Sequence, residues 1–124
     1  MEHTIKVKDG VKFKELNKYF IELCHALNHC CITFGRNYVI TSANDGKHSK
    51  ESYHYKNMAW DIRLNDLPSS HWYVLQSTMK ASLGKYWDIL VENTDSPTNV
   101  HLHCEADMNK IADLFLEMHP EGDR

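Results

Sequence analysis

Hydrophobic positions recur at two different spacings along the chain, and together they predict a mixture of helices and strands. Between residues 12 and 29, apolar side chains return every three or four positions, which predicts an amphipathic helix. Strands are predicted over 58–64 and 100–105, where apolar side chains gather on one face and polar ones on the other, and over the β-branched and apolar segment 87–92. A shorter alternation near the start predicts a strand within 3–8.

The intervening segments complete the predicted order of elements. Residues 30–43 are rich in β-branched and aromatic residues around a Gly-Arg-Asn break, so we expect two strand-like pieces there. Proline near the start and Gly84 at the end frame a second helix over 67–84, and residues 106–118 predict a third. The polar stretches 44–57 and 93–99 predict loops. This order predicts an α+β fold with a mainly antiparallel sheet and flanking helices.

Composition narrows the class of protein. The 124 residues suit a single domain, 1–124. The net charge of -3, without a Lys/Arg cluster, argues against nucleic acid as a partner. No apolar stretch is long enough to span a membrane, and the N-terminus lacks the apolar core of a signal peptide. We therefore expect a monomeric cytoplasmic protein, with no membrane partner, whose four cysteines are reduced thiols.

The nine histidines are the unusual feature of the composition, and strand alternation brings some of them together with an acid. In 58–64, Asp61 points away from the face that carries Trp60 and Ile62. In 100–105, His101 and His103 share one face in the same way. Imidazole nitrogen and carboxylate oxygen are zinc ligands, and His54, from the preceding loop, is a candidate for the remaining one.

Residues 45–62 resemble the zinc-site segment of the hedgehog signalling domain and of the D-alanyl-D-alanine carboxypeptidases. Their shared pattern is S-x-H-x-x-G-x-A-x-D followed later by H-x-H; here the first part is matched by Ser52, His54, Ala59 and Asp61, and the second by His101 and His103. The likeness extends over about 40–105. It implies a hedgehog/DD-peptidase-like fold and a zinc ion held by His54, Asp61 and His103. It also implies that His101 lies beside the metal and that His48 is an additional site histidine.

Two positions depart from the family pattern. Asn57 replaces the family glycine, and asparagine tolerates the left-handed backbone better than most residues. The family's general base precedes H-x-H, which points to Glu92, but the loop 93–99 is longer than usual and contains Asp95 as a competitor. We favour Glu92, because the end of a strand is a firmer platform than a loop.

The resemblance implies a zinc peptidase that hydrolyses the peptidoglycan stem peptide at a D-alanyl-D-alanine or L-alanyl-D-glutamate bond. In such an enzyme Glu92 is the base, and His101 or His48 stabilises the oxyanion. A small phage-encoded lysis protein would have this size. The alternatives are a recognition module in which zinc is structural, as in hedgehog, and a domain that binds no metal.

Other conspicuous residues receive simpler interpretations. His25 and His29 are expected on a helix surface, because the segment lacks the glutamate of a zincin motif. His71 and His119 are taken as helix-end residues. The three tryptophans, Trp60, Trp72 and Trp87, are expected in the core. Arg36 and Arg63 are both candidates to bind a peptide carboxylate, and the sequence does not choose between them.

Overall fold

The computed structural model of the chain describes residues 4–11, 18–44, 58–108 and 110. These residues form five strands and two helices, in the following order along the chain: β1 (Ile5–Val7), α1 (Lys18–Phe34), β2 (Tyr38–Asn44), β3 (Met58–Arg63), α2 (Ser69–Leu83), β4 (Trp87–Glu92) and β5 (His101–Ala106). The predicted strands 58–64, 87–92 and 100–105 are thereby confirmed to within one residue at each end.

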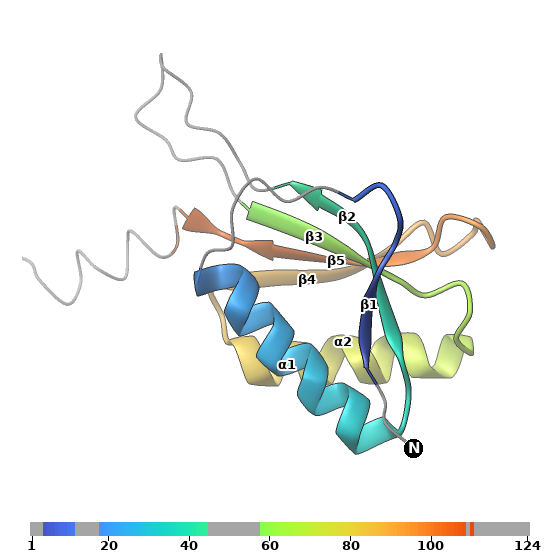
Figure 1. The fold of residues 1–124 in the computed structure, drawn as a ribbon, viewed down its shortest axis with the longest axis horizontal. Coiled ribbons are helices and arrows are strands. Elements are labelled where there is room, and N and C mark those ends of the chain that lie inside the picture. Colours follow the sequence, from blue (N-terminus) through green and yellow to red (C-terminus); the bar gives the residue numbers. More distant parts are fainter. Residues whose placement is uncertain (1–3, 12–17, 45–57, 109, 111–124) are drawn as a thin grey trace, which may run out of the picture.

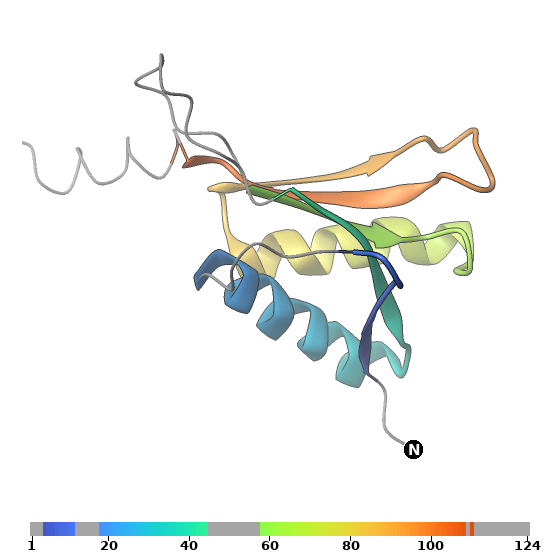
Figure 2. The same ribbon diagram turned by 45° about the horizontal axis from the view of Figure 1, so that its top comes forward.

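The strands form one sheet in the order β1-β2-β3-β5-β4 (Figure 1). The short β1 runs parallel to β2, and every other pair in the described sheet is antiparallel. Both helices lie on the same side of this sheet, so its other face is not covered by either of them (Figure 2). The expected α+β class with a mainly antiparallel sheet is confirmed.

The core lies between the sheet and the two helices, and strand alternation supplies its sheet side. Trp60 and Ile62 of β3, Leu102 and Cys104 of β5, and Ile89 of β4 are almost or completely buried. From the helices, Leu23 and Leu27 of α1 and Leu75 and Met79 of α2 pack against them. Each buried leucine or isoleucine side chain contributes roughly 1.5–3 kcal/mol relative to an exposed one.

The prediction of a strand at residues 30–34 was wrong, because α1 continues through Phe34. Cys30 and Cys31 are fully buried and extend the apolar face of the helix, whereas the β-branched Ile32 is 72% exposed and imposes no packing requirement. The helix ends at Gly35, whose positive φ of 61° allows the Arg36 amide to bond the Cys31 carbonyl at 3.3 Å. Tertiary burial therefore outweighs local β propensity here.

Several other sequence-based expectations can be compared with the structure. Trp60 and Trp87 are buried as expected; Trp72 is only partly buried and donates its indole N–H to the carbonyls of Leu64 and Leu67. His25 and His29 are exposed on α1. All four cysteines are free thiols.

Most of the third helix predicted over 106–118, and His119 after it, lie outside the described residues. No helix in the described ranges is long and apolar enough to cross a membrane.

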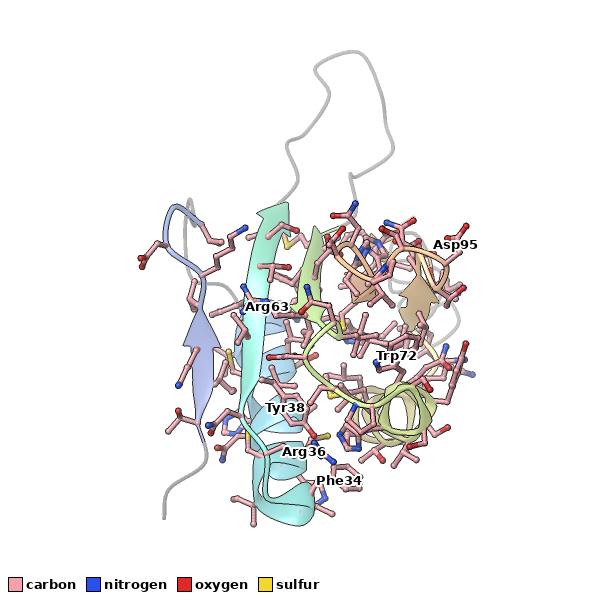
Figure 3. All side chains as sticks on the ribbon, turned by 90° about the vertical axis from the view of Figure 1, so that its right-hand side faces the viewer. Phe34, Arg36, Tyr38, Arg63, Trp72 and Asp95 are labelled. Atoms are coloured by element: carbon pink, nitrogen blue, oxygen red, sulfur yellow. The ribbon has the colours of Figure 1, made fainter. Side chains whose placement is uncertain are left out.

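His71, in the first turn of α2, has a structural role that the sequence did not indicate. Its side chain is 8% exposed, its Nε2 lies 2.7 Å from the Tyr38 hydroxyl, and the Phe34 ring meets it edge-on. Figure 3 shows Phe34, Arg36 and Tyr38 where the chain leaves α1 and enters β2. Burial, and secondarily the charge of Arg36, lower the pKa of His71 below its ordinary value. The hydrogen bond between this ring and the Tyr38 hydroxyl connects β2 to α2.

This arrangement predicts that acidification weakens the fold. The unfolded chain protonates His71 near its ordinary pKa of about 6.5, whereas the folded protein does so only at lower pH. The contribution of His71 to the free energy of unfolding should therefore fall as the pH drops below about 6.5, so wild type should lose stability relative to a His71→Gln variant. Urea denaturation between about pH 7 and pH 5, in the presence of a chelator, measures this. His25→Gln, on the surface of α1, should keep the wild-type dependence. Identical slopes for wild type and His71→Gln would contradict the assignment.

Candidate metal centre

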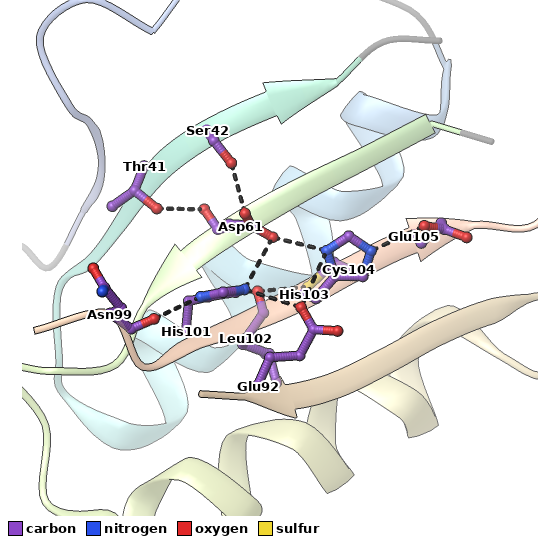
Figure 4. A network of polar contacts seen from close by, with 10 residues as sticks. All are labelled: Thr41, Ser42, Asp61, Glu92, Asn99, His101, Leu102, His103, Cys104 and Glu105. Atoms are coloured by element: carbon purple, nitrogen blue, oxygen red, sulfur yellow. Dashed lines mark hydrogen bonds and ion pairs between the residues drawn. The ribbon is translucent and has the colours of Figure 1, made fainter. Parts of the chain in front are cut away.

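The uncovered face of the sheet carries a row of polar side chains from the neighbouring strands β3, β5 and β4. In the sheet register, Asp61 of β3 lies opposite His103 of β5, and Arg63 lies opposite His101. His101 in turn lies opposite Glu92 of β4. Because alternate residues of a strand share a face, all of these side chains project from the side without helices. Figure 4 shows Asp61, Glu92, His101 and His103 converging there.

A bulge in β2 contributes to the environment of Asp61. The pairing shifts between Ile40, which faces Ile62, and Ser42, which faces Asp61. Without the extra residue, Ile40 and Ser42 would point to the same side; with it, Ile40 is buried and Ser42 reaches the open face. The Ser42 hydroxyl donates to Asp61 Oδ2 at 2.7 Å, which leaves Oδ1 directed at the histidines.

His103 is held from both sides of its ring. Its Nδ1 lies 2.8 Å from Asp61 Oδ1, and its Nε2 lies 2.9 Å from Glu105 Oε1. A carboxylate bound to the outer nitrogen fixes the ring and its tautomer, which is how proteins commonly orient histidines that bind metals. Burial lowers the pKa of His103, but hydrogen bonds that the ring donates to the carboxylates of Glu105 and Asp61 outweigh this effect, so the pKa lies above its ordinary value. The two carboxylates therefore favour the protonated form of this ring.

His101 is oriented in the same manner by the backbone. Its Nδ1 lies 2.7 Å from the Asn99 carbonyl oxygen, which can only accept a hydrogen bond, so Nδ1 carries a proton. When the ring is neutral, the lone pair is therefore on Nε2. This atom faces the cluster, 3.8 Å from Asp61 Oδ1 and 3.0 Å from Glu92 Oε1.

Glu92 reaches the cluster despite the long loop after it. Its Oε1 lies 3.0 Å from His101 Nε2 and 3.9 Å from His103 Nδ1. Asn93, with a φ of 59°, turns the chain immediately after β4, and Ser96 bonds back to its carbonyl. The extra residues thus form a compact turn beyond the strand ends. Asp95 is exposed on this loop (Figure 3) and forms no ion pair with the described histidines.

The converging atoms suit a metal ion. Asp61, His101 and His103 each offer one ligand atom, and these atoms lie within 4.8 Å of one another. Tetrahedral ligands at about 2.0–2.2 Å from zinc lie roughly 3.4 Å apart, so small side-chain adjustments would close the site. Each ring has its other nitrogen already bonded, as the previous contacts show. The described residues therefore form a possible metal site of mixed nitrogen and oxygen character.

The predicted site residues are only partly placed by these observations. Asp61, His101, His103 and Glu92 come together as expected, whereas His48 and His54 lie outside the described residues. Sequence reasoning missed Ser42 and Glu105. Glu105 has the same strand parity as His101 and His103, so alternation was the signal that identifies it. Ser42 carried no such signal, because the bulge reverses its expected face.

Comparison with known proteins gives no further assignment. No family model, no curated protein and no solved structure matches this chain. The assignment of a function therefore rests on the motif and on the contacts described above.

Proposed function

We propose that this protein is a zinc-dependent peptidase that hydrolyses amide bonds of peptidoglycan stem peptides. The observation that carries the proposal is the position of Glu92, whose carboxylate adjoins two oriented imidazoles and Asp61 on one open face. A module that used the metal only for structure would not need a carboxylate there. The substrate class comes from the resemblance of 45–62 and H-x-H to the family described above.

In this proposal Asp61 and His103 hold the zinc together with His54, and His101 lies beside it. This division of roles comes from the resemblance; in the structure the carboxylate nearest to His101 Nε2 is that of Glu92, at 3.0 Å. When bound, zinc would polarise a carbonyl oxygen and make water acidic near neutral pH. Ser42 and Glu105 orient Asp61 and His103.

The protein's own groups then move the protons. Glu92 accepts a proton from the attacking water, whose oxygen bonds to the scissile carbonyl carbon. Glu92 then donates that proton to the leaving nitrogen as the C–N bond breaks. His101, held by the Asn99 carbonyl and by Glu92, is placed to donate from Nε2, when protonated, to the oxygen on which negative charge develops.

The assignment of Glu92 as the base predicts a separation of activity from zinc binding. Glu92→Gln should keep stoichiometric zinc but lose roughly 10²- to 10⁴-fold in kcat, because the amide cannot accept the proton. Asp95→Asn, its matched control on the loop, should retain wild-type activity. Zinc content by plasma mass spectrometry and release of amine from purified peptidoglycan measure the two quantities. Activity that survives in Glu92→Gln would contradict the assignment of Glu92 as the base. Zinc bound by wild type without any cleavage would favour the recognition module.

The two histidines of β5 should differ in their effects. His103→Ala should abolish zinc binding and activity together, because it removes a ligand. His101→Ala should keep zinc and lose roughly 10²- to 10³-fold in kcat, the range for removing one oxyanion donor. Equilibrium dialysis against ⁶⁵Zn, paired with the same cleavage assay, separates the cases. If His101→Ala lost zinc as completely as His103→Ala, His101 would be a ligand rather than a neighbour of the metal.

A further inference from the structure

Two histidines and a glutamate share one exposed face of α1, on the helix side of the sheet and away from the candidate metal centre (Figure 2). His25 and His29 are four residues apart, and Glu22 precedes His25 by three. At 3.6 residues per turn, these three positions fall within an arc of roughly 60° around the helix axis. All three are exposed. The arc therefore presents two imidazoles and a carboxylate together to the solvent.

The end of α2 supplies a second wall beside this face. A cleft of about 480 Å³ between the two helices is lined by Glu22, His25, Ala26, His29, Ser82 and Leu83. Ser82 and Leu83 belong to the last turn of α2, which lies alongside α1 (Figure 1). The carbonyl groups of a helix give its last turn a partial negative charge, which favours a nearby cation. Lys80, the basic residue of that turn, lines a different pocket. The helix end and Glu22 thus favour a positively charged occupant of the cleft.

The protein makes little other use of these three side chains. Within the described part of the chain, the side chains of Glu22 and His25 form no hydrogen bond or ion pair. His29 Nε2 lies 3.4 Å from the Thr33 hydroxyl, at the long end of the range for a hydrogen bond. Such a contact costs little to break, and exposed side chains change rotamer within nanoseconds. Both rings and the carboxylate are therefore available to a ligand.

The spacing of these residues is one with which helices hold metal ions. Two histidines at i and i+4 bind a single zinc in H-E-x-x-H helices, and Glu-x-x-His supplies two ligands from one helix in di-iron bundles. Residues 22–29 combine both spacings. The glutamate that a zincin has between its histidines is a general base and not a ligand, so its absence from residues 25–29 excludes that chemistry without excluding a metal.

We propose that Glu22, His25 and His29 form a second site for a divalent transition-metal ion, in the cleft between α1 and α2. Two imidazole nitrogens and one carboxylate oxygen suit zinc and its neighbours in the first transition row. Three protein ligands leave at least one coordination position to water. The site lies on the opposite side of the sheet from Asp61 and His103, and it does not depend on the proposed peptidase function.

The test uses Co²⁺, which is paramagnetic, with ¹⁵N-labelled protein. In wild type, added Co²⁺ should broaden the amide resonances of residues 22–29 and those of Ser82 and Leu83 across the cleft. His25→Gln and His29→Gln should each abolish this broadening. Glu22→Gln should raise the Co²⁺ concentration needed for half of the effect by at least roughly 10-fold, because even residues that only orient a metal ligand contribute 10- to 100-fold.

Asn28→Gln is the matched control, because Asn28 is exposed on the same helix but lines a different pocket. It should keep the broadening of wild type. His103→Ala should also keep it, since that variant changes only the open face of the sheet, and its loss there would contradict an independent second site. No broadening of α1 in wild type, or broadening that survives both His25→Gln and His29→Gln, would overturn the inference. An unchanged response in Glu22→Gln would contradict the three-ligand assignment. The substituted side chains are exposed, so the variants should keep the dispersed amide spectrum of the folded protein.

Discussion

The register that places His103 opposite Asp61 across β3 and β5 determines both the core and the candidate site. Side chains alternate between the faces of a strand, so the same register directs Trp60, Ile62, Leu102 and Cys104 into the core. A slip of one residue would expose these apolar groups and bury the acid and the imidazoles. The free energy that holds the core in register therefore also holds the cluster together. The polar groups need not be stabilising in themselves.

The open face of the sheet lowers the cost of placing four ionisable side chains next to one another. Two imidazoles and two carboxylates would be costly to bury without full compensation. Here they remain partly exposed, and three of the four are oriented by a neighbour: Ser42 for Asp61, Glu105 for His103, and the Asn99 carbonyl for His101. Their convergence is independent of the long loop between β4 and β5, because the strand pairing alone brings Glu92 to His101. A loop can therefore lengthen in this position without displacing the candidate base.

Much of this arrangement follows from the sequence because it depends on alternation within single strands. The faces of Asp61 and of His101 and His103 were predicted on that basis. The features that escaped prediction depend on contacts between distant residues. Helix α1 continues through Cys30 and Cys31 because the core buries them, and His71 is buried where Tyr38 and Phe34 meet it from other parts of the chain. The bulge that turns Ser42 toward Asp61 depends on the pairing of β2 with β3, and no hydrophobic pattern within β2 predicts it.

The central claim is that a metal ion belongs between Asp61 and His103 on the open face of the sheet. Crystals of the protein grown with zinc, and diffraction data collected on both sides of the zinc absorption edge, test it most directly. We expect an anomalous peak about 2.0–2.2 Å from His103 Nδ1 and from an Asp61 carboxylate oxygen, with Glu92 close by but not bound. An anomalous map with no peak on this face, or with zinc held only by other residues, would contradict the account.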